Sequence, residues 1–205
     1  MHSDHDNQGK PIPRPQLTFP SDEADCLFAY YRSAQAILEY GSGGSTIIAA
    51  ENAPGTTITV ESDLQWAEML RRYLEQRSLA QKVHVHHVDI GPTRGWGFPT
   101  SFGLNRIRFP GYVTSVRWQT FFSKPDVVLI DGRFRVACLL SVALHTERHT
   151  TVLFDDYTNR PQYQVVERYL RPKETVGRMA LFEIEAGQIG PGAYLDYLQY
   201  LFRPG

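Results

Sequence analysis

The chain has 205 residues, of which 42% are hydrophobic, and its 21 basic and 22 acidic residues give a net charge of −1. This hydrophobic content supplies a packed core and excludes wholesale disorder. Proteins that bind nucleic acids mainly through the phosphates are usually basic. The near-neutral charge disfavours this class, so we expect no nucleic-acid partner.

The cysteines and the first residues indicate the compartment. The two cysteines, Cys26 and Cys138, are too few for a disulfide scaffold and lie in apolar stretches, so we interpret them as core residues. The sequence starts without the basic and then apolar segments of a signal peptide, and no apolar run reaches the ~20 residues of a membrane helix. We therefore expect a cytoplasmic protein with no membrane partner.

Residues 1–20 contain four prolines and are predicted to form a flexible or extended N-terminal segment, followed by a single α/β domain over residues 21–205. That domain begins with a helix from Ser21 and then alternates between strands and helices. The predicted strands cover 36–40, 57–60, 83–88, 126–130, 150–154 and 178–185, and the predicted helices cover 45–50, 66–74, 136–144 and 161–170. The tail over 192–202 fits either a helix or a seventh strand. The alternation predicts a Rossmann-like, mostly parallel sheet with helices on both faces, whose strands end at one common ligand-binding edge.

A glycine-rich loop follows the first predicted strand, in the segment Glu39-Tyr40-Gly41-Ser42-Gly43-Gly44-Ser45-Thr46. Glycines allow tight turns and close approach of a ligand. Glu61 ends the next strand twenty residues after Gly41, where a carboxylate can accept hydrogen bonds from both ribose hydroxyls of a nucleoside. A dinucleotide-binding loop needs a third glycine where Thr46 stands, which disfavours an NAD-dependent oxidoreductase. The acidic Glu39 would repel a pyrophosphate but suits a ligand that carries an ammonium or sulfonium group.

With these residues the chain resembles the class I S-adenosylmethionine (SAM)-dependent methyltransferases, over about residues 35–185. The first motif of that family, an acid-x-Gly-x-Gly loop, is matched by Glu39, Gly41 and Gly43, and its ribose-binding acid is matched by Glu61. Asp89 matches the acid that often lies near the adenine amine. The resemblance implies SAM as the cofactor. It assigns cofactor binding to Glu39, Gly41, Ser42, Gly43, Glu61, Ser62 and Asp89.

Three carboxylates follow the fourth and fifth predicted strands: Asp131, Asp155 and Asp156. Because carboxylates at one edge repel one another unless a cation or proton intervenes, they are candidate ligands of a hard cation such as Mg²⁺. The pattern resembles the catechol-type O-methyltransferases, which hold a metal with an Asp after the fourth strand and an Asp-Asn pair after the fifth. Asp156 stands in place of that Asn, and Phe134 in place of the family's catalytic Lys.

Two arginines flank Phe134. Arg133 suits bidentate binding of a substrate carboxylate or phosphate, and in the alternative interpretation Arg133 and Arg135 pair with the aspartates themselves. Methyl transfer requires alignment and exclusion of water, and a base only where the nucleophile must lose a proton. The candidate catalytic groups are Asp131, Asp155 and His87, which lies near a strand end beside Asp89.

The segment 91–124 separates the third and fourth predicted strands and contains eight aromatic and five basic residues but no acidic ones. A long segment of this composition at the ligand edge indicates a wall of the substrate pocket, with Trp96 and Arg133 as candidate substrate contacts. It favours an anionic or sugar-like acceptor. A contact between copies in a homo-oligomer explains the same composition equally well.

Taken together, these patterns favour a SAM-dependent methyltransferase that acts on a small molecule, most readily at an oxygen. The first alternative is a protein of the same fold that binds SAM or a nucleoside, or another protein, without catalysis. The less favoured alternative is an NAD-dependent oxidoreductase.

Overall fold

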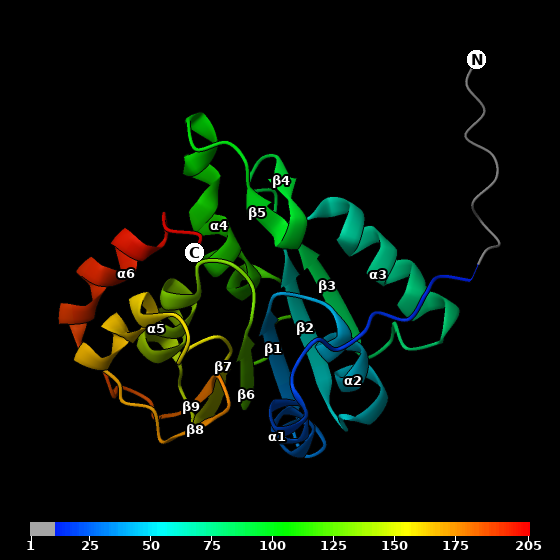
Figure 1. Ribbon diagram of the computed structural model, residues 1–205, viewed down its shortest axis with the longest axis horizontal. Coiled ribbons are helices and arrows are strands. Elements are labelled where there is room, and N and C mark those ends of the chain that lie inside the picture. The colour runs from blue at the N-terminus through cyan, green and yellow to red at the C-terminus, as the bar shows by residue number, and fades with distance from the viewer. Residues whose placement is uncertain (1–10) are drawn as a thin grey trace.

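The computed structural model describes residues 11–205, which fold around a mostly parallel seven-stranded sheet in the order β3-β2-β1-β6-β7-β9-β8 (Figure 1). The strands are β1 (Ala36–Tyr40), β2 (Thr56–Glu61), β3 (Val83–His87), β6 (Val127–Ile130), β7 (Thr150–Phe154), β8 (Glu174–Val176) and β9 (Met179–Ile184). β9 runs antiparallel to both of its neighbours, β7 and β8, and the other pairs are parallel. The predicted Rossmann-like α/β fold is confirmed.

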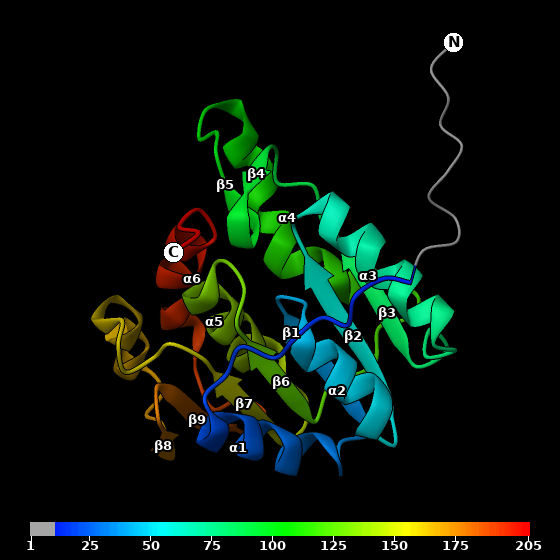
Figure 2. The same cartoon turned by 45° about the vertical axis from the view of Figure 1, so that its right-hand side comes forward.

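Two layers of helices cover the sheet, and Figure 2 shows them on its opposite sides. One layer consists of α1 (Ser21–Tyr31), α2 (Gly44–Asn52) and α3 (Leu64–Gln76), and the other of α4 (Phe109–Thr114), α5 (Arg135–His145) and α6 (Tyr194–Tyr200). Successive side chains of a strand point to opposite faces. Ile37 and Leu129 therefore pack in the core beneath α1, whereas Leu38 and Val128 pack in the core beneath α5. No helix among the described residues has the length and apolar character needed to cross a bilayer.

The C-terminal third differs in two places from the predicted elements, and it resolves the alternative left open for the tail. The predicted strand 178–185 is β9, which forms a hairpin with the unpredicted strand β8 through Gly177, whose φ of +57° allows the tight reversal. β8 escaped prediction because it is three residues long and lacks an apolar run. The predicted helix 161–170 is a 3₁₀ helix (Pro161–Arg168), and the tail over 192–202 contains α6 rather than a strand.

Residues 91–108 of the segment 91–124 form a layer above the carboxyl ends of the parallel strands, at the top of Figure 1, while α1 lies at the bottom. It starts with a hairpin of β4 (Thr93–Arg94) and β5 (Phe98–Pro99), joined by a 3₁₀ turn (Gly95–Gly97). A 3₁₀ turn (Leu104–Arg108), α4 and a last 3₁₀ turn (Ser115–Trp118) follow. Phe109, Tyr112 and Val113 of α4 are buried, so α4 anchors the layer to the sheet.

Residues 11–20 run across α2 without regular secondary structure, and residues 1–10 of the predicted flexible segment lie outside the described residues. Arg14 forms a two-point ion pair with Glu51 of α2, and Pro15 is buried. A Cβ atom on Gly44, the first residue of α2, would lie 2.2 Å from the backbone nitrogen of Leu17. The segment therefore passes directly over the helix that follows the glycine loop.

Candidate functional site

The loops that follow β1 and β6 touch each other at two glycines. Gly41 has a φ of +106°, and a Cβ atom there would lie 2.7 Å from the backbone nitrogen of Gly132. The backbone N–H groups of Asp131 and Gly132 both donate to the carbonyl of Tyr40, at 3.0 and 2.6 Å. The structure thus brings the glycine loop and Asp131 together at the predicted edge. Only glycine fits at position 41.

Glu39 is fully buried and bonds to the protein on both of its oxygens. The hydroxyl of Tyr31 in α1 donates to one oxygen at 2.9 Å, and that of Thr46 in α2 donates to the other at 2.6 Å. Burial raises the pKa of the Glu39 carboxyl, and the bonds from Thr46 and Tyr31 oppose that shift. Glu39 therefore fixes the glycine loop between two helices. Because Glu39 is fully buried, a direct contact with a cofactor, as the sequence predicted, would require the surrounding loop or side chains to move.

Glu61 lies at the end of β2 and meets the glycine loop through Ser42, whose hydroxyl donates to it at 2.6 Å. Its other oxygen accepts the backbone N–H groups of Ser62 and Asp63 at 2.7 and 2.8 Å. An ionised carboxylate has about four acceptor positions, so Glu61 keeps about one for a ligand. The predicted residues Gly41, Ser42, Glu61 and Ser62 are therefore neighbours.

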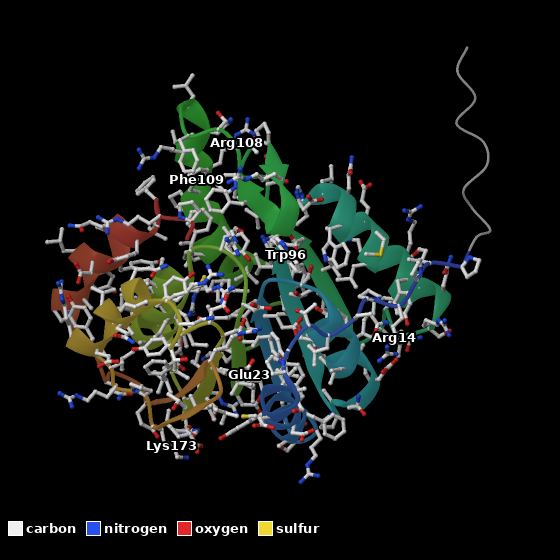
Figure 3. The ribbon with its side chains drawn as sticks, in the orientation of Figure 1. Arg14, Glu23, Trp96, Arg108, Phe109 and Lys173 are labelled. Atoms are coloured by element: carbon white, nitrogen blue, oxygen red, sulfur yellow. The ribbon has the colours of Figure 1, made fainter. Side chains whose placement is uncertain are left out.

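The β4–β5 hairpin lies directly over Glu61. The hydroxyl of Ser62 donates to the carbonyl of Gly97 at 3.0 Å, and a Cβ atom on Gly97 would lie 2.4 Å from that hydroxyl oxygen. Glu61 is accordingly only 7% exposed, whereas Trp96 at the turn of the hairpin is 82% exposed (Figure 3). Trp96 has a φ of +65°, a backbone conformation that is uncommon for a bulky residue and that often marks functional sites. The hairpin forms the wall that a nucleoside would meet on reaching Glu61.

Two other predicted residues, Asp89 and His87, lie farther along the edge. Asp89 accepts the backbone N–H of Gly91 at 2.8 Å and pairs with Arg108 at 2.6 Å, and these two groups lower the pKa of the Asp89 carboxyl. It therefore ties the end of β3 to the segment 91–124. His87 pairs in register with Glu61 on the sheet edge, three strand intervals from β6. That separation is about 14 Å at ~4.8 Å per strand, so His87 does not share a reacting atom with Asp131.

The aspartates after β6 and β7 do converge, and arginines neutralise them. The guanidinium of Arg135, 3% exposed, lies 3.1 Å from Asp131 and 3.2 Å from Asp156, and donates to the backbone carbonyl of Asp155 at 2.6 Å. Arg178, in the turn just before β9, lies 3.0 Å from Asp155 and 3.1 Å from Asp156. Arg160 lies 2.9 Å from Asp156.

This arrangement does not fit the predicted Mg²⁺ site. No three His, Cys, Asp or Glu side chains among residues 11–205 are placed to hold a metal ion together. The positive charge that the carboxylates need comes from arginines instead, as in the alternative interpretation of Arg135. Arg160 and Arg178 were missed by the sequence analysis. Recognising the final hairpin as antiparallel would have placed Arg178 at this edge, because an antiparallel strand starts where β7 ends.

Asp131 differs from its two neighbours in its exposure. Its side chain is 34% exposed, against 2% for Asp155 and 13% for Asp156. Although part of the Asp131 side chain reaches the surface, the surrounding protein removes most of its contact with bulk water and raises its pKa to about 8; Arg135 opposes this shift, and the Asp155 and Asp156 carboxylates add to it. Asp131 is therefore the carboxyl that can exchange a proton with a molecule at the edge.

Arg133 is a half-buried cation beside Asp131 that pairs with no carboxylate in the described part of the chain. Its guanidinium lies 5.7 Å from the centre of the Phe98 ring, and its buried Nε donates to no described group. Burial and the nearby Arg135 lower the pKa of Arg133. A cation in this position suits an anionic group of a ligand.

Solved structures resemble this fold over most of its length. A methyltransferase-like protein from Silicibacter pomeroyi DSS-3 is 42% identical to this chain, with a TM-score of 0.85 over 93% of this chain and 99% of that one. The O-methyltransferase from Bacillus cereus in complex with SAH is 17% identical, with a TM-score of 0.56 over 85% and 84% of the two chains. TomG from Streptomyces achromogenes, an O-methyltransferase in complex with SAM, is 17% identical, with a TM-score of 0.57 over 83% and 82%. The last two share the fold. No model of a known protein family and no curated protein matches the sequence.

Proposed function

Because this chain belongs to the class I SAM-dependent methyltransferase superfamily, we propose that it transfers a methyl group from SAM to an oxygen of a small anionic acceptor. The observation that carries this proposal is the junction of Ser42, Glu61 and the two touching glycines at the carboxyl edge of the sheet. It supplies a carboxylate with spare acceptor capacity beside a loop that a ligand can approach closely.

The residues of this edge fit SAM in distinct roles. Glu61 would accept a ribose hydroxyl, with Ser42 free to turn from Glu61 toward the ligand, and Gly41 and Gly43 would lie against the methionine part. No atom of residues 11–205 lies within 4 Å of a Cβ atom on Gly43, so this face of the loop is open to a ligand. When bound, SAM supplies a methyl carbon made electrophilic by its sulfonium.

Asp131 has the position and exposure of the proton acceptor. As the acceptor oxygen bonds to the methyl carbon and the carbon–sulfur bond breaks, the hydroxyl proton would pass to the ionised Asp131 carboxylate, leaving S-adenosylhomocysteine (SAH). Its pKa of about 8 makes Asp131 a stronger base than an ordinary aspartate, although only a minor fraction is ionised at pH 7. Asp155 is 2% exposed in its side chain and would hold Arg135 and Arg178 rather than touch the acceptor.

Arg133 and Trp96 indicate the class of acceptor. Arg133 is a cation without an internal carboxylate partner among residues 11–205, and Phe98 and the exposed Trp96 supply flat apolar surfaces nearby. An acceptor with a carboxylate or phosphate and a ring or sugar would use both features.

The cofactor is tested by calorimetric titration of the full chain with SAM, SAH and NAD, with and without Mg²⁺. We expect micromolar binding of SAM and SAH, and none of NAD. Glu61→Gln should weaken SAM binding by about ten- to hundredfold, because a hydrogen bond to a charged group contributes about 1.5–3 kcal/mol. Glu68→Gln changes the same residue type at an exposed position of α3 and should leave binding unchanged. The absence of SAM and SAH binding would overturn the proposal.

The acceptor is tested with labelled SAM and matched pairs of hydroxylated molecules, with and without a carboxylate. We expect the carboxylated member to be methylated with a KM at least about tenfold lower, and Arg133→Gln to remove that advantage. Arg94→Gln is the matched control, because Arg94 also lies over the Phe98 ring, at 5.1 Å, but on the outer hairpin. Tight SAM binding without turnover on any acceptor would favour the non-catalytic alternative.

A further inference from the structure

The outermost part of the segment 91–124 is a tip formed by residues 102–108, at the top of Figure 1. Leu104 is 95% exposed, Ile107 is 83% exposed and Phe102 is 44% exposed. Leu104 and Ile107 are three residues apart in a 3₁₀ turn, where side chains at i and i+3 lie on the same side. The tip therefore presents two aliphatic side chains together to the solvent, an arrangement that marks an interaction site in a soluble protein.

Positive charge surrounds these apolar side chains. Arg106 and Arg108 lie within the tip, and Arg94 is exposed on the hairpin below it. Arg106 and Arg94 pair with no carboxylate among the residues described, and Arg108 pairs with Asp89. The sequence places no acidic residue between 91 and 124, although the whole chain carries a net charge of −1. The charge of this end of the molecule is thus complementary to an anionic surface.

The shape and size of the tip favour a lipid surface over a protein. A stable protein interface contains about 20–30 residues on each side, whereas the tip offers three exposed apolar side chains on a narrow projection. Insertion into a bilayer interface needs only a few apolar side chains beside basic ones, and the bilayer adapts to a convex shape.

We infer that the tip docks this protein onto the surface of an anionic lipid bilayer, with Leu104 and Ile107 inserted between lipids and Arg106 and Arg94 among the headgroups. Docking in this way would turn the carboxyl edge of the sheet, with Arg133 and Trp96, toward the membrane. No apolar run of the sequence is long enough to span a bilayer, which is why we expected no membrane partner, but surface docking requires no span.

Co-sedimentation of the full chain with vesicles of phosphatidylcholine, alone or mixed with phosphatidylglycerol, tests this inference without using SAM. We expect binding to the phosphatidylglycerol vesicles that weakens with salt. The double variant Leu104→Ser/Ile107→Ser should lower the partition coefficient by at least about tenfold. Arg106→Gln should lower it about fivefold, the effect of one basic charge at an anionic surface.

The matched control is Phe28→Ser/Arg32→Gln, which removes an exposed apolar side chain and an exposed arginine at α1, at the opposite end of the molecule. It should bind like the wild type. Circular dichroism should show all variants folded, because every substituted side chain is exposed. Equal binding by the wild type and the Leu104/Ile107 variant, or no binding to either vesicle, would overturn the inference. A dimer in solution that dissociates in this double variant would assign the tip to a second copy of the chain instead.

Discussion

Two halves of the same sheet edge satisfy their carboxylates in different ways. In the half formed by β1 and β2, Glu39 and Glu61 accept bonds from hydroxyl and backbone N–H groups within about twenty residues of them in the chain. In the half formed by β6 and β7, Asp155 and Asp156 are neutralised by arginines, of which Arg178 comes from the β8–β9 turn.

The difference separates ligand binding from proton transfer. Ser42, Ser62 and Asp63 fill about three of the four acceptor positions of Glu61, which leaves it room for one more hydrogen bond. Paired arginines hold Asp155 and Asp156 in place, and Asp131 alone remains accessible with a raised pKa. Under the proposed function, the first half would bind the cofactor and the second would position one proton acceptor.

The substitution with the largest expected effect removes Arg135, the cation at the centre of the half formed by β6 and β7. Arg135→Met should lower the free energy of unfolding by about 3–5 kcal/mol, because it leaves buried carboxylates without their partner. Urea denaturation measures the change. Arg148→Met, at a half-exposed ion pair with Asp126, should cost no more than about 1 kcal/mol. Similar losses of unfolding free energy in the two variants would mean that Arg135 stabilises the fold no more than a surface ion pair does.

The next test removes the proposed proton acceptor. Asp131→Asn should lower kcat by about 10²–10⁴-fold while SAM affinity in calorimetry stays within about twofold. In the wild type, kcat should rise with pH and level off above about pH 8, as Asp131 becomes ionised. An unchanged pH profile in the Asn variant would assign the titrating group elsewhere.

The Asp131 carboxyl should also make the free energy of unfolding fall as the pH rises, whereas it makes kcat rise. Because its pKa is higher in the folded than in the unfolded chain, the folded state keeps its proton longer. Its contribution to the free energy of unfolding is full below the ordinary aspartate pKa of about 4 and declines up to about pH 8. Asp131→Asn should flatten this decline in denaturation curves between pH 5 and 8. An identical slope in both proteins would contradict the raised pKa.

A smaller effect is expected from a substitution at Gly41, where the loops of the two halves touch. Gly41→Ala places a Cβ atom 2.7 Å from the Gly132 nitrogen at a φ of +106°, so it should cost at least about 1–2 kcal/mol of stability and weaken SAM binding. Gly190→Ala is the control, since Gly190 has an extended backbone and no described atom lies within 4 Å of its Cβ position. Thermal unfolding and SAM titration measure both variants. Unchanged SAM affinity in the Gly41 variant would separate the glycine loop from the cofactor.

The smallest expected effect is that of metal removal. Because arginines neutralise the aspartates of the second half, treatment with EDTA should change methyl transfer by less than about twofold, and added Mg²⁺ should not restore any loss. Activity that disappears with EDTA and returns with Mg²⁺ would reinstate the metal site predicted from the sequence.

The sequence alone predicted the alternating strands and helices, the Rossmann-like sheet and the common edge that carries both the glycine loop and Glu61. These features follow from short-range signals: apolar periodicity, glycines at a strand end, and the rule that parallel strands end at one edge. Asp131 and Asp155 could be placed at the same edge by the same rule. The arginines that pair with them could not be placed from the sequence, except for Arg135, whose pairing with the aspartates was one of two interpretations.

Tertiary structure decided which charges meet and what covers them. Arg178 reaches Asp155 only because β9 runs antiparallel, and the direction of that strand depends on the β8–β9 hairpin, whose first strand has no apolar pattern. The position of Gly97 over Glu61 depends likewise on the packing of α4 against the sheet, far along the chain from β2. Periodicity reports burial along one element, whereas ion pairs and covering loops depend on how distant elements are arranged in space, which local sequence patterns do not encode.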